Sequence, residues 1–160
     1  MDGEAAESLH CYLVRHGEAV SADVDPRRPL SRRGRDGVAE MARMAVARAV
    51  RVTEICHSGI LRAQETAEIL ADYLRPAQGV RPIAGLLPDD DPEVAKVELE
   101  LADEPLVWVG HLPYMGRLTR VLLEGDELNS AVEFSPATMV CCTRVGTRWE
   151  FAWCISPQPH

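Results

Sequence analysis

The sequence predicts an α/β fold: a three-layer α/β/α arrangement with a mostly parallel sheet and an antiparallel hairpin at the C-terminal end. Two patterns lead to this prediction. Short apolar runs typical of buried strands alternate with longer segments in which apolar residues recur every three or four positions, as in amphipathic helices. Two further apolar segments then flank a short turn at residues 145–147, which indicates a hairpin.

The N-terminal half contains two strand–helix units. The first strand is the largely apolar run over residues 9–14. In the segment that follows, residues 34–50, the apolar spacing predicts a helix with its buried face at Val38, Met41, Ala42, Ala45, Val46 and Ala49. A second strand over residues 52–57 leads to Ser58, which we expect to cap a helix over residues 60–74.

The C-terminal half continues the alternation. A short strand is expected at residues 80–84, and Pro92 favours a helix over residues 91–101, because proline suits the first helical position. The apolar run that ends in Gly110 predicts a strand over residues 105–110. The remaining predicted elements are a helix over residues 113–124, closed by Gly125, and the two hairpin strands, residues 139–144 and 149–155.

The composition is that of an ordinary globular domain. The chain has 160 residues, of which 46% are hydrophobic. A domain of this size buries about two thirds of its unfolded surface without metals or disulfides. We therefore expect a disordered acidic tail at residues 1–8 and a single domain over residues 9–160. The cysteines are odd in number and lack C-x-x-C spacing, so we expect free thiols in a reducing compartment at Cys11, Cys56, Cys141, Cys142 and Cys154.

Several classes of partner are disfavoured. No apolar stretch is long enough to span a membrane, and the acidic start is unlike a basic signal peptide, so we expect a cytoplasmic protein with no membrane partner. The net charge of -8 argues against nucleic acid as a partner. Five arginines nevertheless fall within nine residues and form either a solvated loop or a positive docking rim: Arg27, Arg28, Arg32, Arg33 and Arg35.

Cations and imidazoles lie where predicted strands end. Arg15, His16 and Gly17 follow the first strand, and His111 follows the strand at residues 105–110. Arg62 lies in the first turn of the helix after the second strand, where the helix N-terminus itself attracts anions. Because the carboxyl ends of parallel strands share one edge, these groups should converge on one crevice.

Such a crevice suits a phosphoryl group. Two guanidinium groups, a helix N-terminus and imidazoles would neutralise phosphoryl oxygens as charge redistributes during transfer. A neutral histidine nitrogen can attack phosphorus, and nearby guanidinium charges keep the ring neutral. The residues themselves therefore indicate phosphoryl transfer through a phosphohistidine.

Four motifs resemble the histidine phosphatase superfamily, which includes the cofactor-dependent phosphoglycerate mutases, and within it the short SixA-type phosphohistidine phosphatases. They occur in order over about residues 9–155 of the chain. The motifs are Leu13-Val14-Arg15-His16-Gly17-Glu18, then Pro29-Leu30-Ser31 with Gly34, then Leu61-Arg62-Ala63-Gln64-Glu65-Thr66-Ala67, and finally Gly110-His111-Leu112-Pro113. The resemblance implies a phosphoglycerate mutase-like fold.

The resemblance also implies roles for individual residues. His16 would be the nucleophile, oriented through a backbone carbonyl that Gly17 allows to come close. Arg15, Arg62 and His111 would bind the phosphoryl oxygens. Glu18 would support these residues without touching the phosphoryl group. Ser58 and His57 are uncertain members of the site. His57 is either structural or a ligand at the rim of the crevice. No metal or other cofactor is implied.

Two departures from the family pattern are visible. Ser58-Gly59 stands where relatives usually have Ser-Pro, and His57 precedes it. Larger relatives carry an acidic proton donor between the second arginine and the second histidine, but here no carboxylate matches that motif. The segment Asp89 to Asp91 is better explained as a solvated loop and helix start.

The expected function is removal of a phosphoryl group from a histidine of a phosphorelay or phosphotransfer protein. The chain is short and has little insertion that could form a lid, so its crevice should be open to a side chain displayed on a protein. One alternative is a phosphatase for small phosphomonoesters, which would need a positioned proton donor. Another is a phosphate-binding module without catalysis, against which the complete set of site residues counts.

Overall fold

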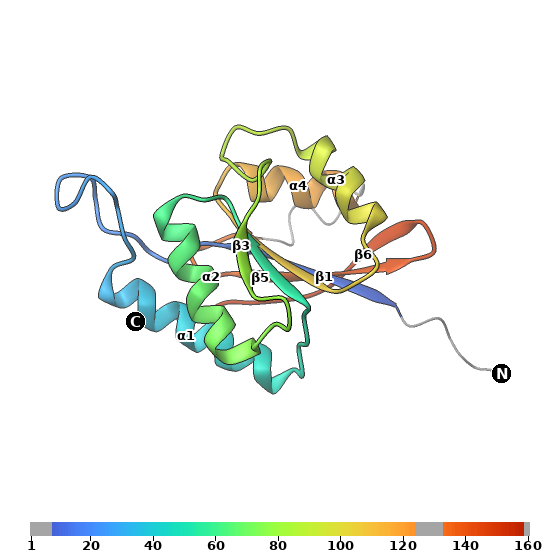
Figure 1. The fold of residues 1–160 in the computed structure, drawn as a ribbon, viewed down its shortest axis with the longest axis horizontal. Coiled ribbons are helices and arrows are strands. Elements are labelled where there is room, and N and C mark those ends of the chain that lie inside the picture. Colours follow the sequence, from blue (N-terminus) through green and yellow to red (C-terminus); the bar gives the residue numbers. More distant parts are fainter. Residues whose placement is uncertain (1–7, 124–132, 159–160) are drawn as a thin grey trace.

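A computed structural model describes residues 8–123 and 133–158. Within these ranges six strands form one sheet in the order β3-β2-β4-β1-β5-β6 (Figure 1). The strands are β1 Leu9–Arg15, β2 Glu54–His57, β3 Val80–Pro82, β4 Leu106–Gly110, β5 Met139–Val145 and β6 Arg148–Ile155. The helices are α1 Arg32–Ala47, α2 Leu61–Leu74, α3 Pro92–Leu101 and α4 Tyr114–Leu123.

The sheet is mostly parallel, as the sequence predicts. Strands β3, β2, β4 and β1 run in the same direction, β5 pairs with β1 in the antiparallel sense, and β6 forms the hairpin with β5. In this register Arg15 at the end of β1 pairs with Gly110 at the end of β4, and His57 at the end of β2 pairs with Val109. The last residues of three strands therefore meet at one edge.

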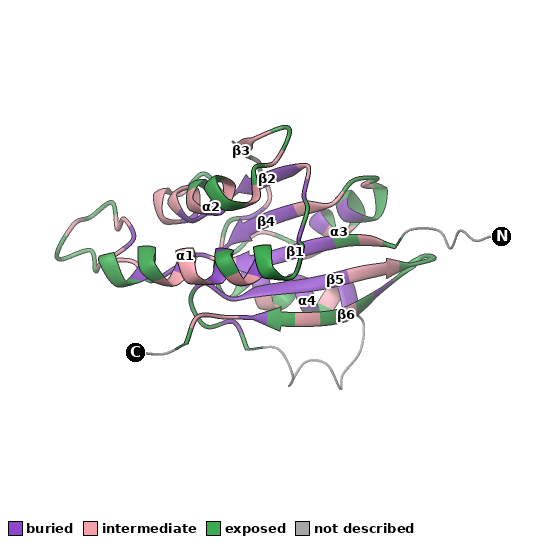
Figure 2. Ribbon diagram, turned by 90° about the horizontal axis from the view of Figure 1, so that it is seen from below, coloured by how far each residue is buried: buried purple, intermediate pink, exposed green. Residues whose placement is uncertain are grey.

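Helices cover both faces of the sheet. Along β1, Tyr12 and Val14 pack in the core beneath α1 and α2, whereas Cys11 and Leu13 pack in the core beneath α3 and α4. Successive strand residues point to opposite faces, so a strand buried on both sides is apolar throughout. Figure 2 shows the central strands buried while the helices expose their outer faces. The three-layer prediction is confirmed.

The observed element boundaries correct some predictions. Helix α1 starts at Arg32, two residues before the expected start, because the Ser31 hydroxyl caps it by accepting from the Gly34 N–H. It ends at Ala47, since Ala49 adopts a positive φ of 61°. Strand β2 begins only at Glu54 and β3 ends at Pro82.

The prediction that Ser58 caps α2 is wrong. Ile60 occupies the cap position and makes no side-chain cap bond. Gly59 turns the chain with a φ of 93°, which leaves the Ser58 hydroxyl beside His111 instead.

Some predictions fall on parts of the chain outside the described residues. These are residues 1–7 of the expected tail, Glu124 and the expected cap Gly125. Within the described ranges no helix is long and apolar enough to cross a membrane. The cysteines are free thiols, and only Cys154 is exposed.

Candidate active site

The predicted site residues converge at the edge formed by the carboxyl ends of β1, β2 and β4. His16 directly follows β1 and His111 directly follows β4, and their ring centroids lie 5.0 Å apart. Backbone bonds fix this approach: the His16 N–H donates to the Gly110 carbonyl at 3.1 Å, and the His16 carbonyl accepts from the Ala137 N–H at 3.2 Å. The structure thus joins two histidines that are 95 positions apart.

The His16 ring is buried, with 8% of its surface exposed, and its orientation is set by the next residue. Its Nδ1–H donates to the Gly17 carbonyl at 2.7 Å, which leaves the lone pair on Nε2. A side chain at Gly17 would crowd Val38, whose Cγ2 atom would lie 2.6 Å from an added Cβ. Glycine is therefore required for the backbone to pass so close to α1.

The surroundings keep His16 neutral. Its pKa is lowered to about 4, first because burial penalises the charged ring and then because of the guanidinium charges of Arg62, Arg15 and Arg28. The Gly17 carbonyl opposes this shift, since it stabilises the protonated ring. At neutral pH the Nε2 lone pair is available for attack.

His111 is even more buried, with 1% of its surface exposed. Burial lowers its pKa to about 3, together with repulsion from His16 when that ring is protonated and from the Arg62 and Arg15 guanidinium groups, so this ring is also neutral. Its Nε2 atom lies 2.6 Å from the Ser58 hydroxyl oxygen. Two neutral imidazoles therefore face one another beside two permanent cations.

The two arginines leave buried N–H groups unused. Arg15 donates from Nη1 to the Phe134 carbonyl at 2.8 Å, but its Nε has no partner. In the described part of the chain five buried side-chain nitrogen or oxygen atoms lack a partner, and three of them are Arg15 Nε, Arg62 Nε and His111 Nδ1. A buried donor without an acceptor costs about 1–3 kcal/mol. An anion bound between these side chains would satisfy the two guanidinium groups.

Thr66 is a residue that the sequence reasoning did not single out as functional. Its hydroxyl oxygen accepts from the Gly17 N–H at 3.1 Å and its own proton goes to the Arg62 carbonyl at 2.8 Å. The side chain thereby links α2 to the loop that orients His16. The motif that contains Arg62 also contains this threonine, so its spacing of four residues from Arg62 was the available signal.

Arg28 is a second residue missed as a member of the site. Its Nε donates to the Val20 carbonyl at 2.9 Å, in a backbone turn with φ of 49°. Its charge lowers the pKa of both His16 and Arg62, so the guanidinium lies within electrostatic reach of the crevice. The sequence showed it only as one member of the arginine cluster.

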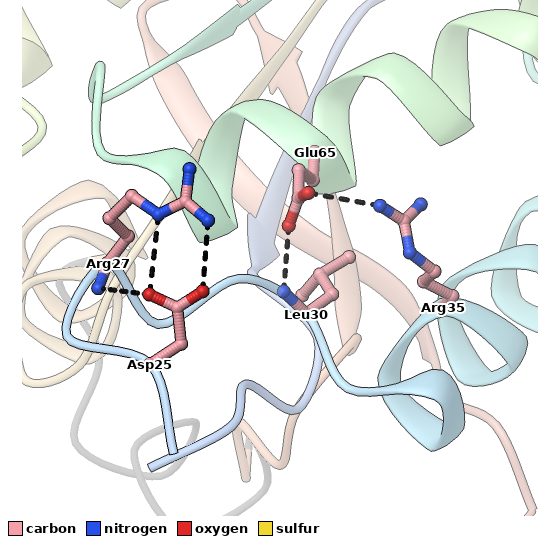
Figure 3. Close-up of polar contacts among 5 residues, drawn as sticks. All are labelled: Asp25, Arg27, Leu30, Arg35 and Glu65. Carbon is pink, nitrogen blue, oxygen red and sulfur yellow. Dashed lines mark hydrogen bonds and ion pairs between the residues drawn. The ribbon is translucent and has the colours of Figure 1, made fainter. Parts of the chain in front are cut away.

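Two other arginines of that cluster form ion pairs (Figure 3). Arg27 pairs with Asp25 at 3.0 Å, and Arg35 with Glu65 at 3.0 Å. Glu65 also accepts from the Leu30 N–H at 2.7 Å, so it ties the arginine loop to α2. The local positive charge is smaller than the count of arginines alone predicts.

The remaining predicted residues take supporting places. Glu18 accepts from the Ser31 hydroxyl at 2.7 Å, beside the start of α1, and lies 3.9 Å from Arg33. His57 is buried, and its Nδ1 accepts from the Gly59 N–H at 3.0 Å, so it holds the turn after β2.

The acidic loop is occupied with its own backbone. Asp90 accepts from the Leu87 N–H at 2.8 Å, and Asp91 caps α3 by accepting from the Glu93 N–H at 3.0 Å. Among the described residues no group of three or more histidine, cysteine or acidic side chains is placed to hold a metal ion.

Comparison with known proteins identifies the class. The sequence profile of the histidine phosphatase superfamily (branch 1) matches residues 11–86, which contain three of the four motifs. The profile match and the order of the motifs support assigning the chain to this superfamily.

Within the superfamily the chain resembles SixA-type proteins. It is 28% identical to phosphohistidine phosphatase SixA of Escherichia coli K12 over 123 residues, which cover 74% of this chain and 76% of that protein. The structure of protein histidine phosphatase SixA complexed with tungstate superposes with a TM-score of 0.81 at 25% identity, covering 93% and 97% of the two chains.

More distant structures share the fold. The putative phosphohistidine phosphatase SixA from Agrobacterium tumefaciens gives a TM-score of 0.80 at 20% identity, with 94% of this chain and 99% of that chain covered. A phosphoserine phosphatase mutant from Entamoeba histolytica, in complex with phosphoserine, superposes with a TM-score of 0.70 at 15% identity. The match covers 91% of this chain and 96% of that chain. The predicted phosphoglycerate mutase-like fold is confirmed.

Proposed function

We propose that this protein is a phosphohistidine phosphatase that dephosphorylates a histidine of a phosphorelay or phosphotransfer protein. The observation that carries the proposal is the set of unpartnered groups Arg15 Nε, Arg62 Nε and His111 Nδ1 beside the neutral His16. Such a cluster has donors and charge for a phosphoryl group and a nucleophile next to it. The 28% identity to a phosphohistidine phosphatase supports the substrate class.

The proposed reaction has two steps. His16 Nε2 attacks the phosphorus of the substrate phosphohistidine, so a new P–N bond forms while the P–N bond to the substrate imidazole breaks. The departing ring takes a proton from solvent and leaves neutral. Water then attacks the phosphorus on His16, which releases inorganic phosphate and restores the free imidazole. Arg15 and Arg62 neutralise the phosphoryl oxygens in both steps.

The preference for a P–N bond follows from the leaving group. An imidazole whose conjugate acid has a pKa near 6.5 leaves easily, whereas an alkoxide needs a general acid that contributes about 10²- to 10⁴-fold. The two loop carboxylates Asp90 and Asp91 accept hydrogen bonds from backbone N–H groups, so we do not assign either of them as the general acid.

The proposal includes a cytoplasmic location, which is a reducing compartment, for the protein and its phosphorelay substrate. The free thiols of the cysteines are compatible with such a compartment.

The test compares turnover of a phosphohistidine protein, p-nitrophenyl phosphate and glycerol phosphate, with His16→Ala as the inactive control. We expect kcat/KM to decrease in that order, and we expect an acid-labile, base-stable phosphoryl label on His16. Hydrolysis of glycerol phosphate as fast as that of the phosphohistidine protein would instead favour the phosphomonoester alternative, which the phosphoserine phosphatase of the same fold makes concrete. Full activity in His16→Ala would overturn the assignment of His16 as the nucleophile.

A further inference from the structure

We propose that Ser58 is a positioning residue that fixes which nitrogen of His111 carries the proton, so that Nδ1–H is presented to the phosphoryl group. This inference rests on the proposed function, because it assumes that His111 binds the transferring phosphoryl group. It assigns Ser58 a specific task, which neither the family motif nor the comparisons supply.

The bonds around the Ser58 hydroxyl define its direction. The Ile60 N–H points at the Ser58 oxygen from 3.2 Å and occupies one of its lone pairs. The His111 Nε2 atom lies 2.6 Å from the same oxygen. The Ser58 hydroxyl has one proton to give, and His111 Nε2 is an acceptor within hydrogen-bond distance of it. In the proposed arrangement Ser58 donates to Nε2.

The other nitrogen of His111 then carries the proton. The low pKa of this buried ring keeps it neutral, and a neutral imidazole has one N–H, so acceptance at Nε2 places the hydrogen on Nδ1. Nδ1 is buried and without a partner. As an N–H it can donate to a phosphoryl oxygen, whereas as a bare lone pair it would repel one.

The turn after β2 explains why Ser58 is available for this task. Gly59 has a φ of 93°, and its N–H donates to the buried His57 Nδ1 at 3.0 Å. A proline at position 59 would have no N–H and could not adopt a positive φ. The Gly59 turn and its bond to His57 therefore help to hold Ser58 beside His111.

The first test is a ¹⁵N–¹H correlation spectrum of the histidine rings in the wild-type protein at pH 7. We expect the His111 Nδ1 to be protonated and Nε2 to be of the unprotonated type. The opposite assignment would overturn the proposal directly, and this measurement needs no variant to fold.

The second test compares Ser58→Ala with Ser58→Thr, which keeps the hydroxyl, and with Ser156→Ala as a matched control on a loop at the same edge. We expect Ser58→Ala to lower the single-turnover rate of His16 phosphorylation about tenfold or more at unchanged substrate affinity, with a mixture of His111 tautomers. Ser58→Thr should recover most of the rate, and Ser156→Ala should match the wild type.

Two results are informative in different ways. If the wild type forms phosphorylated His16 and Ser58→Ala does so at the same rate, the role of Ser58 is refuted while the proposed function stands. If the wild type forms no phosphohistidine, the proposed function itself fails, whatever Ser58 does.

Discussion

The Thr66 hydroxyl oxygen accepts a hydrogen bond from the Gly17 N–H at 3.1 Å, while the Gly17 carbonyl accepts from the His16 Nδ1–H at 2.7 Å. One peptide unit on each side of Gly17 thus connects helix α2 to the His16 ring. Arg62 lies one turn before Thr66 on the same helix, and its carbonyl receives the Thr66 proton at 2.8 Å. A single helix therefore carries Arg62 and also holds, through Thr66, the backbone that orients the His16 ring.

Thr66→Val should damage both stability and catalysis. The change keeps the shape of the side chain but leaves the Gly17 N–H buried without an acceptor, which costs about 1–3 kcal/mol. We expect the free energy of unfolding in urea to fall by that amount and kcat to fall more than KM changes, because the His16 ring loses its fixed orientation. Thr66→Ser, which retains the hydroxyl, is the control. Wild-type behaviour of the valine variant in both assays would contradict this relationship.

The rate of His16 phosphorylation should be insensitive to mild acid. Only the neutral ring attacks, and its pKa of about 4 lies well below the ordinary value. In rapid single-turnover measurements we expect the rate to be constant from about pH 8 to pH 5 and to fall tenfold per unit below the pKa. A half-maximal rate near pH 6.5 would show that the ring is not protected from protonation.

Stability should depend on pH for the same reason. The pKa values of His16 and His111, about 4 and about 3, are lower than the ordinary value of 6.5 in the unfolded chain. Between these limits the unfolded state binds more protons, so the free energy of unfolding is highest above about pH 6.5 and falls as the pH drops towards 4. Urea denaturation at pH 7 and pH 5 measures this loss, which His111→Gln should reduce.

Two adjacent arginines should behave differently. Arg28 acts on the charge balance of the crevice, and Arg28→Gln should lower kcat/KM about tenfold on any phosphoryl substrate, the scale of one charge-assisted hydrogen bond. The Arg27 side chain is 76% exposed and pairs with Asp25, so Arg27→Gln should change the rate less than about twofold. Equal losses in the two variants, measured with p-nitrophenyl phosphate, would place Arg28 outside the crevice.

Two glycines of α1 provide a matched pair for packing. A side chain at Gly34 would overlap the Glu18 carbonyl oxygen, so Gly34→Ala should lower the free energy of unfolding by more than about 2 kcal/mol. At Gly37 an added Cβ would meet only Pro157, at 3.5 Å. Gly37→Ala should therefore raise the free energy of unfolding by about 0.5–1 kcal/mol, since alanine is the better helix residue. Equal melting temperatures for the two variants would show that α1 does not approach the Glu18 backbone this closely.

The layered fold and the ends of most elements were within reach of the sequence. The spacing of apolar residues identifies strands and helices locally. Parallel strands end at one edge of the sheet, so Arg15, His16, Arg62 and His111 could be expected to meet. The boundary errors arose where a contact from another segment decides the conformation. Ser58 is the clearest case, because Ile60 takes the cap position of α2 and the Ser58 hydroxyl lies 2.6 Å from His111 Nε2.

By itself the sequence determined the order of elements and predicted which residues gather at the candidate site, because residue type and spacing act locally. Only the tertiary structure decided how those residues are held: Thr66 against Gly17, Arg28 near His16, and the pairing of Arg27 and Arg35 with carboxylates. Such contacts join positions far apart or in irregular loops. Their geometry depends on how whole helices pack against the sheet, which no local pattern of residues specifies.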